Sequence, residues 1–417
     1  MQKTSYPDVS RDVYVYSQAG ADLNEHLKRI EGYNTRQIDP TGWNEIVYTG
    51  ADFFEKMLNE KKGNVMVTAG NNGKKTDYIK QTLSAGIHVL ADKPMAINVS
   101  GFEKLKACFH IAQEKGLLLY DIMTERFEIT TMLQKEFSML PAVYGEQQKG
   151  SVDDPGIVKE SVHHFFKTVS GKPLIRPAWF FDVNQQGEGI VDVTTHLVDL
   201  VQWECFPGQA INYLTDIEIL DANRWTTSIP PARFKEVTGL DAYPGYLKPN
   251  VSNDTLHVYA NGDIRYKIRG VNAKVSVIWN YTYPEGGGDT HYSIMKGSKA
   301  HLIIEQGKEQ NYKPVLYIKA TGADLETFEK GLSASLKTVT DKYPGIGLKQ
   351  TDEKDTWEVL VPAKYHNGHE AHFGQVTENF LKYLKEGSLP AWETPNMIAK
   401  YYVTTQALEL AKKKTGY

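Results

Sequence analysis

The chain has 417 residues, of which 41% are hydrophobic and 24% are charged, and 47 Lys and Arg stand against 51 Asp and Glu for a net charge of −4. This composition predicts a folded protein of about two domains, and it argues against a disordered, collagen-like or disulfide-framework chain. The small negative charge argues against a nucleic acid partner, and no apolar run approaches the ~18 residues of a membrane helix.

The first residues, MQKTSYPDVSRD, lack the charged and then apolar pattern of a secretory signal. We therefore expect a cytoplasmic protein, and a periplasmic location stays open if a signal has been removed. The only cysteines are Cys108 and Cys205, which cannot form a zinc ribbon or a disulfide framework.

Strands and helices alternate over residues 1–125, which predicts a Rossmann-type parallel sheet with helices on both faces. The predicted strands span residues 13–16, 45–48, 65–68, 87–91 and 117–120, and the predicted helices span 23–30, 52–59, 76–85 and 102–114. A dinucleotide-binding sheet usually carries Gly-x-Gly-x-x-Gly after its first strand, and no glycines in the first unit have that spacing. We therefore expect this domain to be incomplete at its N-terminal end, without the first strand and its glycine loop.

The pattern changes over residues 126–417, where most segments resemble the strands of an antiparallel sheet. Asn261-Gly262 between residues 255–260 and 263–269 is a strong hairpin signal. Further strand candidates are residues 143–147, 211–220, 275–281, 291–295, 301–305 and 315–319, and the closing helices are expected at 372–385 and 396–412. We predict a second, α+β domain with an open, mostly antiparallel sheet.

Asp92-Lys93-Pro94 directly follows the predicted strand 87–91. Ligands bind at the carboxyl ends of parallel strands, so Lys93 could project into a cofactor cleft. Pro94 fixes its own φ and can follow a cis bond that directs Lys93. The alternative is a surface turn with a solvated lysine, and position alone does not separate the two.

The segment 187–199 contains a second candidate group. A helix is expected from Gly189 to Cys205, with Asp192 and His196 four residues apart and Asp199 on the same stripe. This stripe is either a solvated polar face or an acid–base pair in which Asp192 orients His196 and His196 moves a proton.

Histidines gather at two further places. His366, His369 and His372 lie near Glu370, but Gly368 interrupts the helix and no H-E-x-x-H is present, so we expect a loop leading into a helix rather than a metal site. His163 and His164 form either a surface pair or part of the cleft wall.

Two of these motifs together resemble the Gfo/Idh/MocA oxidoreductase family, and the likeness is strongest to its long members from gut-type Bacteroidetes. Residues 85–96, AGIHVLADKPMA, resemble the family's A-G-K-H-V-x-x-E-K-P-x-A, and residues 192–199, DVTTHLVD, resemble D-x-G-x-H-x-x-D. Residues 68–71, Arg126-Phe127 and Trp179 resemble further family segments, in the same order along the chain. Asp92, Thr194 and Gly70 depart from the family's Glu, Gly and Pro.

The resemblance implies an NAD or NADP cofactor and assigns roles to individual residues. Lys93 would contact nicotinamide and the substrate hydroxyl, His196 would be the acid or base, and Asp192 would be its partner. The implied cofactor contacts are Asn71, Asp92, Lys93 and Pro94, and the implied substrate contacts are Trp179, Asp192 and Asp199.

The function implied by this resemblance is hydride transfer to or from a secondary alcohol of a sugar, inositol or sugar derivative. One alternative is an NAD-dependent glycoside hydrolase that oxidises its substrate transiently and eliminates the substituent. Another is a non-catalytic sugar-binding or assembly protein with a degenerate cofactor site. We expect a small carbohydrate or polyol as partner, no nucleic acid or membrane, no bound metal, and a homo-oligomer, dimer or tetramer, formed through the antiparallel sheet.

Overall fold

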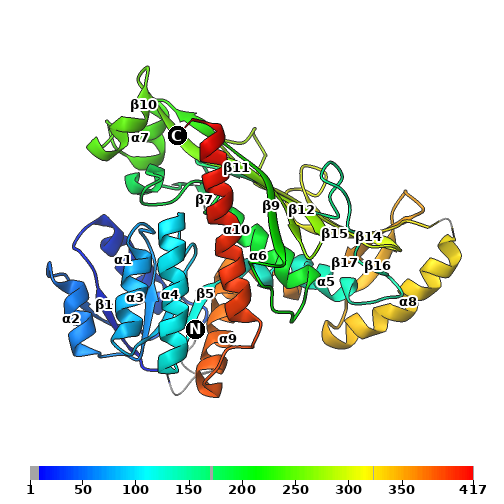
Figure 1. The fold of residues 1–417 in the computed structure, drawn as a ribbon, viewed down its shortest axis with the longest axis horizontal. Coiled ribbons are helices and arrows are strands. Elements are labelled where there is room, and N and C mark those ends of the chain that lie inside the picture. Colours follow the sequence, from blue (N-terminus) through cyan, green and yellow to red (C-terminus); the bar gives the residue numbers. More distant parts are fainter. Residues whose placement is uncertain (1–8, 170–171, 323, 417) are drawn as a thin grey trace.

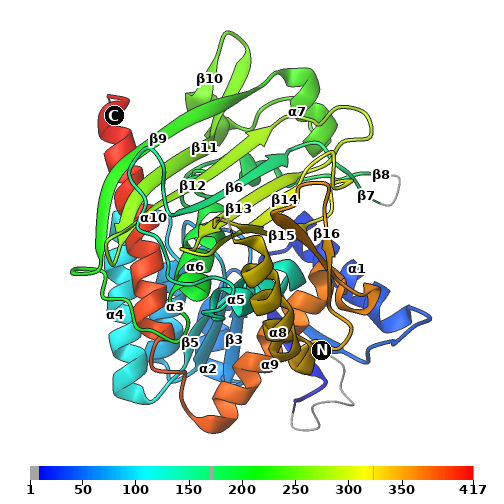
Figure 2. The same ribbon diagram turned by 90° about the vertical axis from the view of Figure 1, so that its right-hand side faces the viewer.

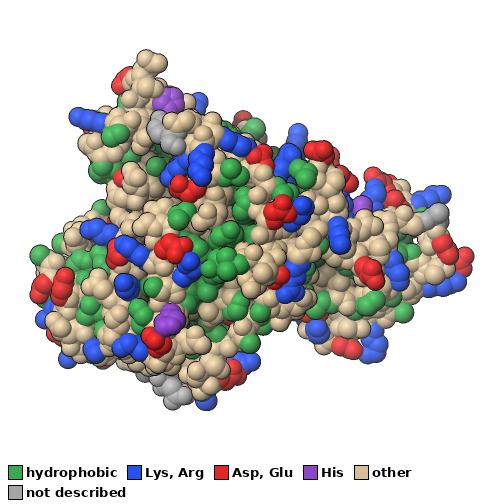
Figure 3. Space-filling view, viewed as in Figure 1, with side chains coloured by type: hydrophobic (Ala, Val, Ile, Leu, Met, Phe, Trp, Pro, Cys, Tyr) green, Lys and Arg blue, Asp and Glu red, His purple; other side chains and the backbone are tan. Residues whose placement is uncertain are grey.

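The computed structural model describes residues 9–169, 172–322 and 324–416, which form a parallel-sheet unit, a larger antiparallel sheet and a long C-terminal helix between them (Figure 1). Within these ranges no helix has the length and apolar character needed to cross a membrane. Side chains of both charge signs are spread over the face shown in Figure 3, in line with the small net charge.

The N-terminal unit confirms the predicted Rossmann-type alternation. Its strands are β1 (Asp12–Tyr16), β2 (Asn44–Tyr48), β3 (Val65–Thr68), β4 (His88–Asp92) and β5 (Leu119–Ile122), and its helices are α1 (Ala21–Thr35), α2 (Phe53–Glu60), α3 (Lys75–Ser84) and α4 (Val99–Lys115). All pairings are parallel, and the middle residues of β4 are fully buried because helices cover both faces of the sheet. Asn98 caps α4 at its start, and Gly116 ends it in the left-handed conformation.

The parallel strands form two separate ladders, β2-β1 and β3-β4-β5. Between β1 and β3 lies a groove of about 3130 Å³ that both strands line along their whole length. In a doubly wound sheet of strand order 3-2-1-4-5-6, the observed order β2-β1-groove-β3-β4-β5 leaves the position of strand 1 open among the described residues. Val67 of β3 is accordingly 64% exposed. Within residues 9–169, 172–322 and 324–416 no strand occupies this position, and the expectation that the first strand is missing stays a prediction.

The second unit is built on a ten-stranded sheet of order β10-β11-β12-β6-β13-β14-β15-β17-β16, with β9 paired to β11. The bounds are β6 (Ile157–His164), β9 (Ile217–Ile229), β10 (Val251–Ser252), β11 (Thr255–Ile268), β12 (Val271–Asn280), β13 (Thr290–Lys296), β14 (Ala300–Gln306), β15 (Val315–Ala320), β16 (Gly347–Gln350) and β17 (Thr356–Leu360). Every pair is antiparallel except β12 with β6, which confirms the predicted open, mostly antiparallel sheet. A small separate ladder joins β7 (Thr168–Val169) to β8 (Lys172–Pro173).

The helices of the second unit are α5 (Ile129–Ser138), α6 (Thr194–Cys205), α7 (Pro231–Thr238), α8 (Leu325–Lys342), α9 (Gly368–Glu386) and α10 (Glu393–Lys414), with 3₁₀ turns η2 (Thr124–Phe127), η3 (Ala178–Phe181), η4 (Gly245–Asn250) and η5 (Ala363–Tyr365). Helices α5 and α6 lie against the sheet (Figure 2). Helix α10 contributes to two hydrophobic cores, with Met397 and Tyr401 packed into the parallel unit and Ala399 and Val403 packed against α6 and the large sheet. Helix α10 therefore packs against both units.

The predicted hairpin at Asn261-Gly262 is wrong, because β11 runs through both residues as one strand. The Asn261 side chain accepts a hydrogen bond from the Trp279 backbone N–H at 2.7 Å, and the pairing with β9 shifts register beside it. The backbone of Gly189 packs so closely there that a Cβ on it would lie 1.8 Å from the Ala260 oxygen. The Asn-Gly pair thus occupies a bulge that receives the 187–199 segment.

Further boundaries differ from the prediction. Helix α9 begins at Gly368 instead of the expected residue 372, so His369 lies in the helix together with His372 and not in the loop expected before it. Residues 143–147 form a turn with one isolated bridge, from Gln147 to Gly297, instead of a strand. The strand expected at 211–220 is β9, which begins at Ile217 and continues to Ile229. The helix expected from Gly189 begins at Thr194, because residues 187–193 turn tightly against β11, so Asp192 precedes the helix.

Candidate active site

Lys93 and Asp192 meet at the boundary between the two units. Lys93 follows the end of β4, before a cis bond to Pro94, and its Nζ lies 2.6 Å from Asp192 Oδ1. The side chains are 18% and 8% exposed, so the ion pair is largely shielded from water. The structure therefore joins the two motifs that the sequence analysis singled out separately.

Charges around Asp192 keep it ionised. Burial alone would raise its pKa, but the charge of Lys93 and the hydrogen bonds from Lys93 and Gln186 outweigh burial and lower the pKa below its usual value. Asp192 thus remains a hydrogen-bond acceptor at neutral pH.

His196 lies in the first turn of α6, and its ring is neutral at physiological pH. Burial and the charge of Lys93 lower its pKa to about 4, against the opposing charges of Glu125, Asp199 and Asp192. Its buried Nδ1 has no hydrogen-bond partner within the described ranges. A neutral imidazole can accept a proton, which is the property a general base needs.

The loop between β3 and α3 carries Asn71, the implied cofactor contact. Its side-chain amide donates to Gln185 Oε1 at 2.7 Å, and the neighbouring Asn72 donates to the Gln186 oxygen at 2.7 Å. Asn71 also lines the large groove between β1 and β3. This loop thus connects the groove with the segment that precedes Asp192.

Lys75 is a site residue that the sequence analysis missed. It is 1% exposed, and its ammonium donates to Asn72 Oδ1 at 2.5 Å and to the backbone oxygen of Asp92 at 2.8 Å. Burial lowers its pKa to about 8. Lys75 therefore supports the backbone directly before Lys93. Sequence carries little signal for this, since a lysine at the start of a helix is ordinarily solvated.

Asp199 does not face the Lys93–Asp192 pair. It is 2% exposed, and its oxygens accept hydrogen bonds from Arg126 at 2.6 and 2.7 Å and from Lys400 at 2.8 Å. All these bonds lie in the protein interior and connect Asp199 to Arg126 and Lys400, and the implied substrate contact of Asp199 stays a prediction.

Trp179 lies at the rim of the groove, where its indole N–H donates to Asp22 of α1 at 2.9 Å. The side chain therefore connects η3 of the second unit to the first helix of the parallel unit.

Glu125 and the histidines of α9 form another side of the site. His369 Nε2 lies 3.2 Å from Thr124 Oγ1 and 3.5 Å from Glu125 Oε1. Burial would raise the pKa of Glu125, but the bond to His369 and the nearby His196 and His291 lower it to about 2. The described residues contain no group of three or more His, Cys, Asp or Glu side chains placed to hold a metal ion.

His163 and His164 contact one carboxylate at the end of β6. Their Nδ1 atoms lie 3.3 and 3.0 Å from the two oxygens of Asp289, which also pairs with Lys167. Arg176 donates to the backbone oxygens of Phe165 at 3.0 Å and His164 at 3.2 Å, so it packs against the end of the same strand.

A parallel nucleotide-type sheet, with a Lys–Asp–His group where its strand ends meet a second domain, defines a dinucleotide-dependent oxidoreductase. Residues 25–120 match the family model "Oxidoreductase family, NAD-binding Rossmann fold", and residues 133–412 match "Putative oxidoreductase C terminal domain". The chain belongs to the Gfo/Idh/MocA oxidoreductase family. Its domain at 25–120 is an NAD-binding Rossmann domain, and its cofactor is NAD or NADP.

Solved structures agree with this assignment. A "putative oxidoreductase" from Parabacteroides merdae is 68% identical, with a TM-score of 0.96 over 98% of this chain and 93% of that chain. Levoglucosan dehydrogenase in complex with NADH is 13% identical, with a TM-score of 0.61 over 97% and 88% of the two chains. KijD10, a 3-ketoreductase from Actinomadura kijaniata in complex with NADP and TDP-benzene, is 13% identical, with a TM-score of 0.56 over 95% and 88%. The last two share the fold alone, and no curated protein matches the chain.

Proposed function

We propose that this oxidoreductase transfers hydride between NAD(P) and a secondary alcohol of a sugar, inositol or sugar derivative. The observation that carries the proposal is the Lys93–Asp192 ion pair beside His196, built from both units and shielded from water. A site that must remove a proton from an uncharged hydroxyl needs a neutral base and a nearby positive charge, and these side chains provide both.

Each side chain has a chemical role in this proposal. A nicotinamide held by Asn71, Asp92, Lys93 and Pro94 would supply the acceptor or donor of the hydride. His196 takes the hydroxyl proton during oxidation and gives it back during reduction. The Lys93 ammonium stabilises the negative charge that develops on that oxygen. Asp192 holds Lys93 in place and can accept a hydrogen bond from a neighbouring substrate hydroxyl.

The residues proposed to hold the cofactor lie at the ends of β3 and β4. Asn71 lines the groove there, Asp92 is the last residue of β4, and Lys93 and Pro94 follow it. These residues suit the nicotinamide half of a dinucleotide, because ligands of doubly wound sheets bind at the carboxyl ends of the strands. The turn after β1 contains a single glycine, Gly20, and is no phosphate loop.

The test is an absorbance assay for NADH or NADPH with a panel of inositols, aldoses and anhydrosugars, at millimolar NAD or NADP. We expect turnover with at least one polyhydroxylated substrate and its loss in Lys93→Met and His196→Asn. Aryl glycosides form a second arm, in which NAD-dependent release of the aryl group without net NADH would assign transient oxidation with elimination. Unchanged turnover in both variants would contradict the proposal.

A further inference from the structure

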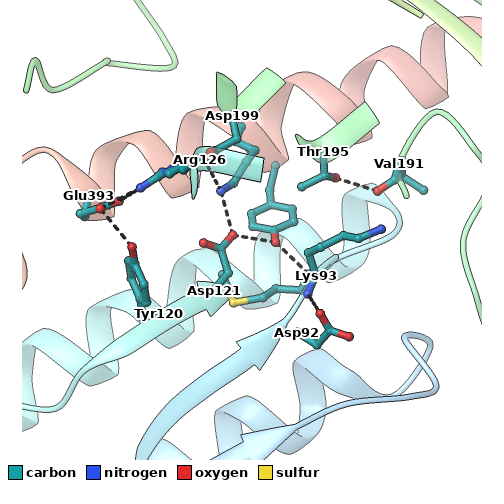
Figure 4. A network of polar contacts seen from close by, with 12 residues as sticks. Asp92, Lys93, Tyr120, Asp121, Arg126, Val191, Thr195, Asp199 and Glu393 are labelled. Atoms are coloured by element: carbon teal, nitrogen blue, oxygen red, sulfur yellow. Dashed lines mark hydrogen bonds and ion pairs between the residues drawn. The ribbon is translucent and has the colours of Figure 1, made fainter. Parts of the chain in front are cut away.

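Buried charged and polar side chains converge on one side of the Lys93 segment, in a network that the proposed reaction does not use (Figure 4). They come from the end of β5, from η2, from α6 and from α10, and none is more than 5% exposed: Tyr120, Asp121, Arg126, Asp199, Glu393, Lys400 and Tyr401. Figure 4 shows the Lys93 side chain extending to the opposite side of the site, toward Val191.

Tyr401 of α10 connects this network to the Lys93 segment. Its hydroxyl accepts a hydrogen bond from the backbone N–H of Met95 at 3.1 Å and donates to Asp121 Oδ2 at 2.9 Å. Met95 is two residues after Lys93. The tyrosine hydroxyl thus holds the backbone that leaves Lys93 and Pro94.

Lys400 connects the same network to the helix of His196. Its ammonium lies 2.8 Å from Asp121 Oδ2 and 2.8 Å from Asp199 Oδ1, and Asp199 is three residues after His196 in α6. Arg126 holds Asp199 from the other side and reaches Glu393 at 2.9 Å. Two neighbouring residues of α10 therefore connect the Lys93 segment of one unit to the His196 helix of the other.

Stability alone gives a weak reason for such a network. Buried ion pairs can often be replaced by packed hydrophobic residues without loss of stability, since burial of the charges offsets their attraction. This network also contains three carboxylates and only two cations, Arg126 and Lys400. Directed hydrogen bonds, however, fix relative positions more narrowly than apolar packing does, and a catalytic group must be held within about 0.5 Å.

We propose that Tyr401 and Lys400 are positioning residues, through which α10 sets the placement of the Lys93 segment relative to the helix that carries His196. That this placement matters for catalysis rests on the proposed function. That Tyr401 and Lys400 hold the Lys93 segment and the His196 helix in place, which we call the mechanical connection, does not. The two can therefore be tested separately.

The central variant is Tyr401→Phe, which keeps the buried ring and removes the hydroxyl, leaving the Met95 N–H without its acceptor. We expect amide hydrogen exchange in the peptide covering residues 92–98 to rise about tenfold, with no change in β11 and β12. The matched control is Tyr266→Phe, because Tyr266 is equally buried and its hydroxyl makes no hydrogen bond in the described part of the chain. The control should leave the 92–98 peptide as in the wild type.

Asp121→Asn is the second variant, since it keeps the side-chain shape and removes the charge that Tyr401 and Lys400 share. It should loosen residues 92–98 and the start of α6 together. Lysine labelling followed by mass spectrometry supplies an independent readout, and Lys93 should be labelled several-fold faster in both variants. Unchanged exchange and labelling, or an increase spread evenly over the chain, would overturn the proposal.

If a substrate is found in the absorbance assay, Tyr401→Phe should lower kcat about tenfold and leave the KM for NAD within a factor of two. A fall in melting temperature with unchanged kcat would mark Tyr401 as merely structural and would overturn its positioning role. Local loosening of residues 92–98 with no turnover on any substrate would support the mechanical connection and count against the proposed function.

Discussion

Lys93 contributes a positive charge that touches Asp192 and acts on the ring of His196. Replacing it with methionine keeps most of the side-chain packing and removes the charge that would stabilise the developing oxyanion. We expect kcat/KM to fall by about 10²–10³, as for loss of one oxyanion donor. The melting temperature should also fall, because the buried Asp192 loses its cation.

Two comparisons separate these effects. Lys106→Met is a suitable control, since Lys106 pairs with Glu103 on the surface, with side chains 31% and 58% exposed, and should change neither turnover nor stability appreciably. The double variant Lys93→Met/His196→Ala should lose less activity than the sum of the single losses, because the residues act as a unit. Strict additivity would contradict a shared site.

The pH dependence follows from His196. With its pKa at about 4, the ring stays neutral through the physiological range, so the rate of alcohol oxidation should fall only as pH drops toward 4. In Lys93→Met this acid limb should move to higher pH, because the positive charge that holds the imidazole neutral is gone. The profile of kcat/KM between pH 3.5 and 8 measures both, and an acid limb near 6.5 in the wild type would contradict the assignment.

The buried histidines His196 and His291 predict that the folded state loses stability in acid. His196 and His291 both have a pKa of about 4 in the folded state, lowered first by burial, against about 6.5 in the unfolded chain. Between these values the unfolded state binds more protons, so stability decreases as pH falls from about 6.5 to about 4. The melting temperature at pH 5 should therefore lie below that at pH 7.

At the level of elements, the groove between β1 and β3 leaves the facing edges of these two strands unpaired, where other doubly wound sheets have a strand between them. If this strand position is open, Val67→Cys should react rapidly with a maleimide, because Val67 is 64% exposed. Val89→Cys in β4 is the matched control, since Val89 is 0% exposed and should not react. Background labelling should be slow, because burial raises the thiol pKa of Cys108 to about 12 and that of Cys205 far above its usual value. Protection of the thiol introduced by Val67→Cys would mean that another segment covers β3.

The open position also bears on cofactor affinity. Pyrophosphate binding in this fold uses backbone N–H groups at a helix N-terminus behind a glycine turn, and the described residues of the parallel sheet show no such turn after β1. We expect this chain to bind NAD with a Kd nearer 1 mM than 1 μM by calorimetry. Sub-micromolar binding would show that the remaining contacts are sufficient.

Over the whole molecule, one face of the large sheet carries apolar side chains outside every core cluster. Val158, Ile294, Ile303 and Tyr317 lie directly opposite one another across four strands, and all but Ile294 are partly exposed. We expect this face to form a homodimer, and Ile303→Glu should convert the dimer to a monomer in light scattering. The control is Lys330→Glu, since Lys330 is 74% exposed on α8, which packs on the opposite face of the sheet. A monomeric wild-type protein would contradict the prediction.

Local pattern in the sequence accounts for much of this protein. The strands and helices of the parallel unit follow from hydrophobic periodicity and from turn residues such as Gly116, which act over a few neighbours. Asp92-Lys93-Pro94 and the Asp192–His196 pair stand out for the same reason, since each motif lies within eight residues. The resemblance to the family then indicates that the two motifs belong to one site.

Only the tertiary structure shows the roles of side chains whose partners lie far away in the sequence. Asp199 shares a polar stripe with His196 in the sequence, yet its carboxylate is held by Arg126, 73 residues away, and by Lys400, 201 residues away. Lys75 supports Asp92, Tyr401 holds Met95 across 306 residues, and Asn261-Gly262 bulges because Gly189 packs against it. Hydrophobic periodicity in the sequence cannot predict such contacts. The free energy of a buried charge or of a close backbone approach depends on which residues the fold brings beside it.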